Sequence, residues 1–295
     1  MKSIKKLLVL VVALLVIFAF AGCSTETEDS ETENDKVEAQ QPTVDDNAEK
    51  TLEGEVTISG STSVEKIGKG AALEFEALYP DVTVTYEGIG SSSGIKNANE
   101  GTSMIGTASR NLKEEEKSWG MNEVAIAYDG VAVISHPDNS LEGLTMDQVQ
   151  SIFKGEITNW SQVGGADEEI VVVSRENGSG TRGAFEELVG FEDELTENAI
   201  IAEGNGNVQT TVAGNEKAIG YVSFTYINET VKPLLVDGVE PTTENVLSGD
   251  YGISRPFLMV YHDENMNEAS EEFVNFVLSE DGQMIVEDKG GIPVK

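Results

Sequence analysis

The chain has 295 residues and a formal net charge of −34 at pH 7, from 53 acidic and 19 basic residues. A field of this sign repels nucleic acid and anionic lipid, and no basic patch with interleaved aromatic residues offsets it. Cys23 is the single cysteine, so no disulfide can form within one molecule. These features exclude a nucleic-acid-binding protein and a disulfide-stapled scaffold.

The N-terminus has the composition of an export signal. Three lysines lie within the first six residues, and an apolar stretch of fourteen residues from Leu7 to Phe20 ends at Ala21-Gly22-Cys23. This stretch is shorter than the ~20 residues of a transmembrane helix. A basic start and small residues before the cut are typical of a secretory signal. We predict a signal peptide at residues 1–22, with an uncleaved anchor as the alternative.

The segment after Cys23 is strongly acidic. Residues 24–50 contain ten acidic residues, two lysines and almost no large apolar side chain. Burial there cannot offset the entropy lost on ordering. We predict that residues 23–51 form an acidic disordered tether. A calcium-binding run is disfavoured because the carboxylates lack the spacing and the glycine of a dedicated loop.

From Leu52 onward, strand-like and helix-like segments alternate. Apolar residues recur at helical spacing from Val64 to Tyr79, and the pattern stops before Pro80. By the same reasoning we expect strands at 55–59, 82–86, 104–108, 170–173 and 218–222, and helices at 94–99, 145–153 and 181–189. The alternation predicts an α/β fold with a mainly parallel sheet covered by helices.

The later segments suggest two lobes that are connected more than once. The apolar run 130–134 is long enough to pass between domains, and 253–261 returns as a strand interrupted by Pro256. A closing amphipathic helix carries Phe273, Phe276 and Val277 and, beyond them, Met284 and Ile285. We predict one lobe from residues 52–130 and 230–295 and a second from 131–229. A cleft between two lobes is a natural ligand site.

Three runs rich in Gly, Ser and Thr each follow a predicted strand and precede a predicted helix. They are 60–63, 88–94 and 174–181. Backbone N–H groups and hydroxyls converge at such positions, where they can bind an anion. The carboxyl ends of parallel strands also bring such turns together. The three runs therefore predict a site for a small oxyanion.

Each run offers donors of a particular kind. In the first, Ser61, Thr62 and Ser63 supply hydroxyls and amides, and an ordinary helix N-cap is the alternative. In the second, Gly88 and Gly90 let the backbone approach closely. Its third glycine falls one position late for a dinucleotide loop, and a surface turn is the alternative.

The third run holds the main cation. Arg175 follows an apolar strand, where a partly desolvated guanidinium can make a two-pronged contact with an oxyanion. Ser179, Gly180 and Thr181 can donate from the helix start. A structural ion pair between Arg175 and Glu176 is the alternative, although neighbours on an extended segment point in opposite directions.

Four motifs carry a resemblance to a known family. They are 60–63, 86–94, Phe153-Lys154-Gly155-Glu156-Ile157-Thr158-Asn159-Trp160 and 174–181. In this order they resemble the signatures of the phosphate-binding subunit of the ABC phosphate importer. The resemblance implies a type II periplasmic-binding-protein fold with two lobes that close on phosphate and deliver it to a membrane permease. The segment before Cys23 resembles a lipobox, with Phe20 where leucine is usual, which implies an acylated Cys23.

The resemblance also implies roles for single residues. Ser91, beside Ser92, stands where family members donate a hydroxyl and an amide to phosphate. Ser109 stands where some members place an aspartate that accepts the proton of phosphate, and such an acceptor rejects sulfate, which has no proton to give. Asn177 replaces an aspartate that often pairs with the arginine.

Catalysis finds little support in the sequence. His136 and His262 are the only histidines, and neither a Ser-His-Asp set nor a metal-ligand spacing is present. We therefore predict no enzyme and no cofactor. A secreted phosphohydrolase is the disfavoured enzyme alternative.

The predicted function is a binding lipoprotein on the extracytoplasmic face of a bacterial cell membrane. It captures inorganic phosphate and passes it to an ABC permease with its ATPase. We predict a monomer. The alternatives are a binding protein for sulfate or molybdate, or a phosphate sensor without a transport role.

Overall fold

The computed structural model describes residues 52–294. The predicted signal peptide, Cys23 and the tether lie outside these residues. The strands are β1 (Glu53–Gly60), β2 (Asp81–Gly88), β3 (Ile105–Ala108), β4 (Asn122–Ser135), β5 (Gly143–Leu144), β6 (Val171–Arg175), β7 (Ile200–Ala202), β8 (Ala218–Ser223), β9 (Lys232–Pro233), β10 (Leu235–Val236) and β11 (Ser254–Tyr261). The helices are α1 (Glu65–Leu78), α2 (Ser91–Asn99), α3 (Glu114–Lys117), α4 (Met146–Phe153), α5 (Gly180–Val189), α6 (Gly204–Ala213), α7 (Thr243–Ser248), α8 (Glu268–Leu278) and α9 (Glu280–Asp288).

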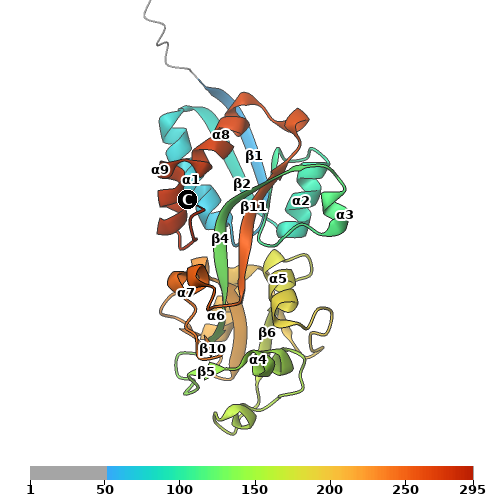
Figure 1. Ribbon diagram of the computed structural model, residues 1–295, viewed down its shortest axis with the longest axis vertical. Helices are drawn as coiled ribbons and strands as arrows, with labels where there is room; N and C mark the ends of the chain where they lie inside the picture. Colours follow the sequence, from blue (N-terminus) through green and yellow to red (C-terminus); the bar gives the residue numbers. More distant parts are fainter. Residues whose placement is uncertain (1–51, 295) are drawn as a thin grey trace, which may run out of the picture. The chain divides into compact units, whose positions relative to one another are not determined.

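The main sheet has the strand order β2-β1-β3-β11-β4-β8-β6-β7, and β9 also pairs with β4 (Figure 1). The pairs of β1 with β2 and β3, and of β6 with β7 and β8, are parallel. The middle of the sheet is antiparallel, because β4 and β11 run in opposite directions. A mixed α/β fold with helices flanking a partly parallel sheet is therefore confirmed.

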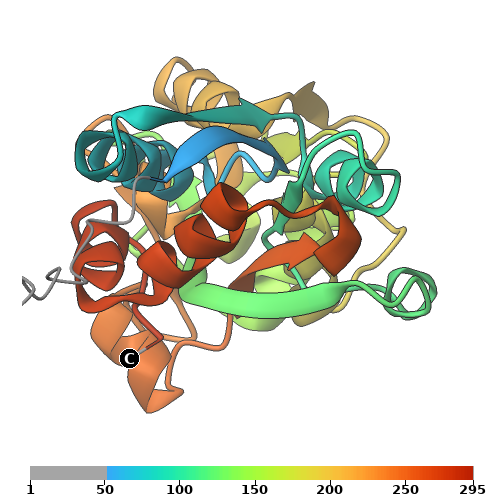
Figure 2. The same cartoon turned by 90° about the horizontal axis from the view of Figure 1, so that it is seen from above.

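β4 and β11 lie side by side along the middle of the molecule (Figures 1 and 2). Residues 122–130 of β4 pair with β11, and residues 131–135 pair with β8. The apolar run expected to leave the first lobe is thus the second half of one continuous strand.

The buried apolar side chains form four clusters that fall into two groups. Two clusters draw from residues 52–127 and 257–286, and two draw from 131–253. Leu234, Tyr251 and Ile253 pack in the second group, and β9 and β10 pair with β4 and β5. The division into lobes stays a prediction. This packing favours a chain that re-enters the first lobe at β11 rather than at residue 230.

Two local expectations need correction. The closing helix is two helices, α8 and α9, because the hydroxyl of Ser279 accepts a hydrogen bond from Gly282 N–H and so starts a new helix. β11 also continues through Pro256. Tyr128, opposite Pro256, exchanges both backbone hydrogen bonds with Ile292, so no N–H is required of the proline.

Within residues 52–294, no helix combines the length and the apolar character needed to span a lipid bilayer.

The close approach of α2 to β1 gives a test of the fold. A Cβ at Gly94 would lie 2.3 Å from Gly60 Cα and 2.5 Å from Ser59 O. We expect Gly94→Ala to lower the free energy of unfolding by about 1–3 kcal/mol through overpacking. Gly252→Ala is the matched control, since a Cβ there meets no atom within 4 Å. Equal urea midpoints for the two variants would contradict this packing.

Candidate functional site

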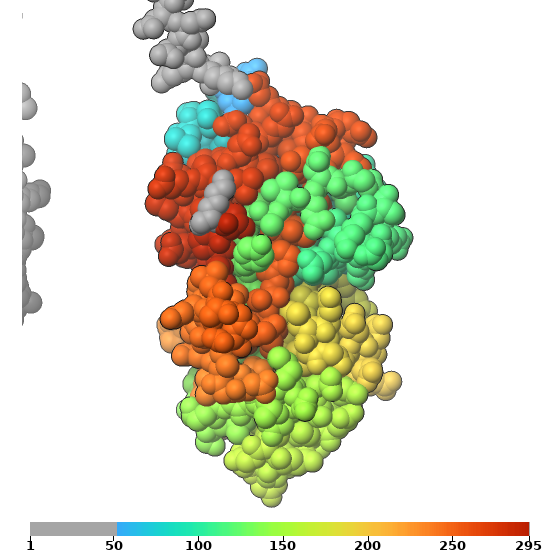
Figure 3. Space-filling model, in the orientation of Figure 1, coloured from blue at the N-terminus to red at the C-terminus, as the bar shows by residue number. Residues whose placement is uncertain are grey.

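The three predicted turns lie at the carboxyl ends of the strands β1, β2 and β6. Residues 60–63 follow β1, residues 88–91 follow β2 and open α2, and residues 175–180 follow β6 and open α5. Residues 108–110, which follow β3, lie beside the first two turns because β1 is parallel to both β2 and β3. Figure 3 shows the segment around residues 90–120 meeting the segment around 175–190 on one face of the molecule.

The first and third turns touch through side chains. Ser63 Oγ lies 2.9 Å from Thr181 Oγ1. Arg175 Nη2 donates to Thr62 Oγ1 at 3.2 Å. Ser63, Thr181 and Arg175 are each 1% exposed or less. Residues that are more than a hundred positions apart in sequence are therefore joined by buried polar contacts.

The second turn and the segment after β3 complete the cluster. Ser61 Oγ donates to Ser109 Oγ at 2.8 Å, and Ser109 N–H donates to Ser91 Oγ at 3.1 Å. Gly180 lies against these hydroxyls, because a Cβ there would fall 2.2 Å from Ser91 Oγ and 2.8 Å from Ser109 Oγ. The backbone of α5 can approach them only where no side chain intervenes. The structure thus brings Ser61, Thr62, Ser63, Ser91, Ser109, Arg175, Gly180 and Thr181 together.

Two predicted hydroxyls have other partners. Ser92 Oγ accepts from Arg110 Nη2 at 3.1 Å, and Arg110 also makes a two-pronged ion pair with Glu116. Ser179 Oγ accepts from Arg182 N–H as the N-cap of α5. The hydroxyls of these two serines therefore stabilise the turns. The backbone of Ser92 also links the second turn to the third, because its N–H donates to Gly178 O at 3.1 Å.

Arg175 is the central cation of the cluster. Its Nε and Nη2 donate to the two oxygens of Glu176 at 2.8 Å and 2.7 Å. The expectation that Glu176 points away was wrong, because β6 ends at Arg175 and the chain then turns. Among the described residues, Arg175 Nη1 is the one buried side-chain nitrogen or oxygen that has no hydrogen-bond partner. A buried donor without a partner is costly, so this position favours an anion.

The ion pair sets the charge state of Glu176. Burial opposes ionisation of this carboxyl, but its hydrogen bonds and ion pair with Arg175 outweigh burial and lower the pKa of Glu176. The carboxylate also accepts from Gly204 N–H at the start of α6. Glu176 thus offsets the charge of Arg175, the role that the resemblance gives to an aspartate at position 177.

Three residues of the cluster were not predicted from sequence. Asn205 donates to both Thr62 and Ser63, and Arg255 donates to Ser63 while pairing with Asp129. Asn205 follows the apolar run 200–202 and stands in the Gly-Asn-Gly-Asn stretch that opens α6, so strand and helix meet there at a glycine-rich stretch as in the other runs. Arg255 is the single charge of β11, and Asp129 lies within an apolar part of β4, residues 124–134, a signal that indicates a buried pair.

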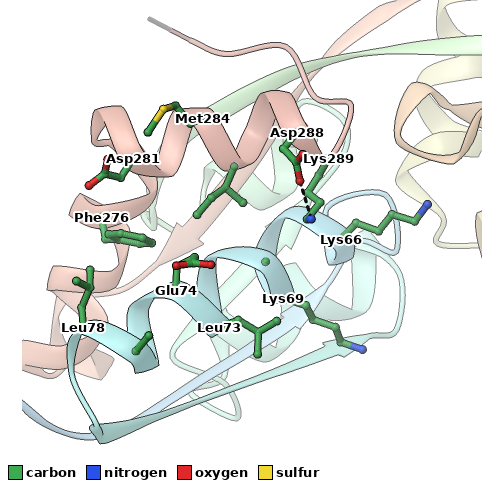
Figure 4. A pocket seen from close by; sticks show the side chains of 13 residues that line it. Lys66, Lys69, Leu73, Glu74, Leu78, Phe276, Asp281, Met284, Asp288 and Lys289 are labelled. Carbon is green, nitrogen blue, oxygen red and sulfur yellow. Dashed lines mark hydrogen bonds and ion pairs between the residues drawn. The ribbon is translucent and has the colours of Figure 1, made fainter. Parts of the chain in front are cut away.

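A large cavity lies away from these turns. It measures about 860 Å³ between α1 and α9, and it is lined by Leu73, Leu78, Phe276 and Met284, with Lys66, Lys69 and Lys289 toward one end (Figure 4). None of the three turns lines it. Residues 52–294 also contain no group of three or more His, Cys, Asp or Glu side chains placed to bind a metal ion.

Comparison with known proteins identifies the family. The model of the PBP superfamily domain matches residues 36–281. The phosphate-binding protein PstS of Bacillus subtilis is 31% identical over 301 residues, which cover 100% of this chain and 95% of that protein. The chain belongs to the PstS-like phosphate-binding proteins of the PBP superfamily.

Solved structures of related proteins support the PstS-like fold. A candidate phosphate ABC transporter substrate-binding protein from Clostridium perfringens, with bound phosphate, is 53% identical with a TM-score of 0.81, covering 82% of this chain and 100% of that one. An ABC-type phosphate transport receptor from Vibrio cholerae is 35% identical with a TM-score of 0.70, covering 80% and 99%. These matches confirm the predicted fold class. All three relatives are described as binding or receptor proteins.

The pairing of Glu176 with Arg175 predicts a pH-dependent stability. We expect Glu176→Gln to lower the free energy of unfolding by about 1–3 kcal/mol at pH 7. Because the folded-state pKa is lowered, this contribution is present above the unfolded value near 4.3 and is lost as the pH falls through the folded value. The difference between the parent and Glu176→Gln should therefore shrink on acidification.

Urea unfolding at pH 7, 5 and 3 measures this difference. Glu187→Gln, an exposed position on α5, is the control and should stay within about 0.5 kcal/mol of the parent. A Glu176→Gln deficit that widens toward acid pH would contradict the assigned pair.

Proposed function

We propose that this PstS-like chain captures inorganic phosphate between the three turns and delivers it to an ABC permease with its ATPase. The single observation that carries the proposal is Arg175 Nη1, a buried donor that has no hydrogen-bond partner in residues 52–294. It belongs to a cluster of hydroxyls that come from both packing groups. Phosphate is the anion we propose because one relative is described as a phosphate-binding protein and another was solved with bound phosphate.

The proposed capture needs no chemical step. A tetrahedral anion gives up its hydration shell on entering a buried site, so fixed donors must replace those lost hydrogen bonds. Hydroxyls at 62, 63, 91 and 181, backbone N–H groups at the start of α5, and the Arg175 guanidinium are donors of this kind, whereas the Ser61 hydroxyl donates to Ser109. Because they come from both groups, a bound ion links the two and favours the closed arrangement.

Selectivity is assigned to Ser109. The carboxylates of Glu176 and Asp129 are each paired with an arginine, so neither is free to accept the proton of phosphate. Ser109 Oγ accepts from Ser61, and it lies 3.4 Å from Ser91 Oγ, where either hydroxyl can be the donor. When Ser109 donates to Ser91, its second lone pair is open. We propose this oxygen as the proton acceptor. Sulfate or molybdate remains the alternative ligand, and calorimetry of the mature chain with phosphate, sulfate and molybdate distinguishes them.

The location and the assembly of the protein are also part of the proposal. The sequence pattern at 1–23 supports export and acylation of Cys23, with the acidic segment 23–51 as a spacer from the extracytoplasmic membrane face. We propose a monomer that docks on the permease. A phosphate sensor is the alternative, and loss of phosphate uptake on deletion of the gene would distinguish transport from sensing.

Arg175→Ala should weaken phosphate binding by ~1.5–3 kcal/mol, the range for a hydrogen bond to a charged group. This corresponds to a Kd about 10 to 150 times higher in calorimetry. Lys154→Ala is the matched control, since Lys154 pairs with Glu156 and Glu194 on the surface, and its Kd should stay within about twofold. Unchanged affinity in Arg175→Ala would remove this arginine from the site.

Cys23→Ser should move the protein from the membrane fraction to the soluble fraction, or leave an uncleaved precursor. The physical reason is that acyl chains, at ~0.8 kcal/mol for each buried CH₂ group, hold the chain to the bilayer. Fractionation and labelling with a fatty-acid analogue measure the change. Continued labelling of the serine variant would place the lipid elsewhere.

A further inference from the structure

Arg255 and Asp129 form a buried pair where the two packing groups meet. They lie directly opposite each other on β11 and β4. Arg255 Nε and Nη2 donate to Asp129 Oδ2 at 3.1 Å and 2.9 Å. Their exposed fractions are 4% and 0%. A fully buried ion pair contributes little net stability to the fold, so stability alone does not explain why these two residues occupy this place.

The guanidinium of Arg255 reaches beyond this partner. Its Nη1 donates to Ser109 O at 2.9 Å, and its Nη2 donates to Ser63 Oγ at 3.1 Å. One side chain from β11 therefore holds the first turn and the segment after β3. Both of these elements carry hydroxyls of the anion site.

The other oxygen of Asp129 continues the network. Asp129 Oδ1 accepts from Ser223 Oγ at 2.8 Å and from Phe224 N–H at 3.1 Å. Ser223 N–H in turn donates to Asn205 Oδ1 at 3.1 Å. This bond fixes the orientation of the Asn205 amide, because its oxygen must face Ser223 and its NH₂ group must face away.

The Asn205 NH₂ group closes the ring. It donates to Ser63 Oγ at 2.9 Å and to Thr62 Oγ1 at 3.2 Å. Arg255, Asp129, Ser223, Asn205 and Ser63 thus form one closed ring of hydrogen bonds, which we name the polar ring. Its members come from β11, β4, β8, α6 and the first turn.

The polar ring fixes the direction in which two hydroxyls donate. Ser63 Oγ accepts from Arg255 and from Asn205, which occupies both of its lone pairs. Thr62 Oγ1 accepts from Asn205 and from Arg175, with the same result. Each hydroxyl can then only donate its proton outward. For Ser63 the acceptor in the structure is Thr181 Oγ1, at 2.9 Å.

We propose that Arg255, Asp129 and Asn205 are positioning residues that make Thr62 and Ser63 obligate hydrogen-bond donors toward the anion, Thr62 directly and Ser63 by way of the Thr181 hydroxyl that it contacts. The inference rests on the proposed phosphate function. Arg255 acts from behind the hydroxyls rather than by contact with the ligand. Most of its effect on affinity should therefore pass through Ser63.

A double-mutant cycle with Arg255→Lys and Ser63→Ala tests this role. Calorimetry with inorganic phosphate gives the four Kd values. We expect each single change to raise Kd about tenfold, and the double variant to lie within about threefold of Ser63→Ala alone. Losses that multiply to about a hundredfold would mean that Arg255 acts on general structure, and would overturn the proposal.

Arg110→Lys is the matched control. Arg110 is also buried and makes a two-pronged pair with Glu116, but it contacts neither Thr62 nor Ser63. Whatever fold-change in Kd Arg110→Lys causes, the double variant with Ser63→Ala should show the product of the two single fold-changes. A non-additive result of the same size for Arg110 would also overturn the assignment.

A second variant covers the case in which Arg255→Lys fails to fold. Asn205→Ala leaves the pair of Arg255 and Asp129 intact, and it should show the same non-additivity with Ser63→Ala. Failure of the parent chain to bind phosphate would refute the proposed function itself. Additive losses in a chain that binds phosphate would refute only the positioning role.

Discussion

The rest of the site depends on one constraint: the buried charges of Arg255 on β11 and Asp129 on β4 must have hydrogen-bond partners. A guanidinium and a carboxylate taken out of water need a full set of partners, and their hydrogen bonds reach the first turn, the segment after β3 and Ser223 of β8. Ser223 N–H continues the network to Asn205 of α6. Shifting any one of these elements would leave a buried charge or hydroxyl without a partner. The turns are therefore held by the sheet that carries them.

The parts of the fold that were predictable are those fixed by local pattern. The helix expected from Val64 to Tyr79 is α1, and strands end and helices begin at the turns 60–63, 88–94 and 174–181. These features were predictable because the spacing of apolar residues and the signals that start a helix depend on a few adjacent residues. The Arg255 pair was missed because Asp129 is 126 positions away. Sequence spacing carries no information about a register between strands that distant, although a charge inside an apolar stretch of each strand is a hint.

The overall acidity and an anion site are compatible because they act over different distances. A formal charge of −34 repels phosphate far from the surface, but salt screens charges separated by more than ~10 Å. Within the cluster, Arg175 and Arg255 are each paired with one carboxylate, so the site holds little net charge. Attraction there must come from aligned donors at hydrogen-bond distance, which explains why hydroxyls and amides outnumber cations in the three turns.

The direction of the hydrogen bonds divides the site into two unlike sides. Thr62 and Ser63 each accept two N–H groups, so neither can accept a proton from the ligand. Ser109 Oγ accepts one bond from Ser61, and it retains a lone pair when it donates to Ser91 Oγ, 3.4 Å away. In the proposed site, a protonated phosphate oxygen would therefore meet only donors on the side of Thr62 and Ser63, and an acceptor on the side of Ser109. In the proposed site, the same hydrogen bonds would recognise the phosphate proton and orient the ion, and the residues that lie behind the hydroxyls would set both.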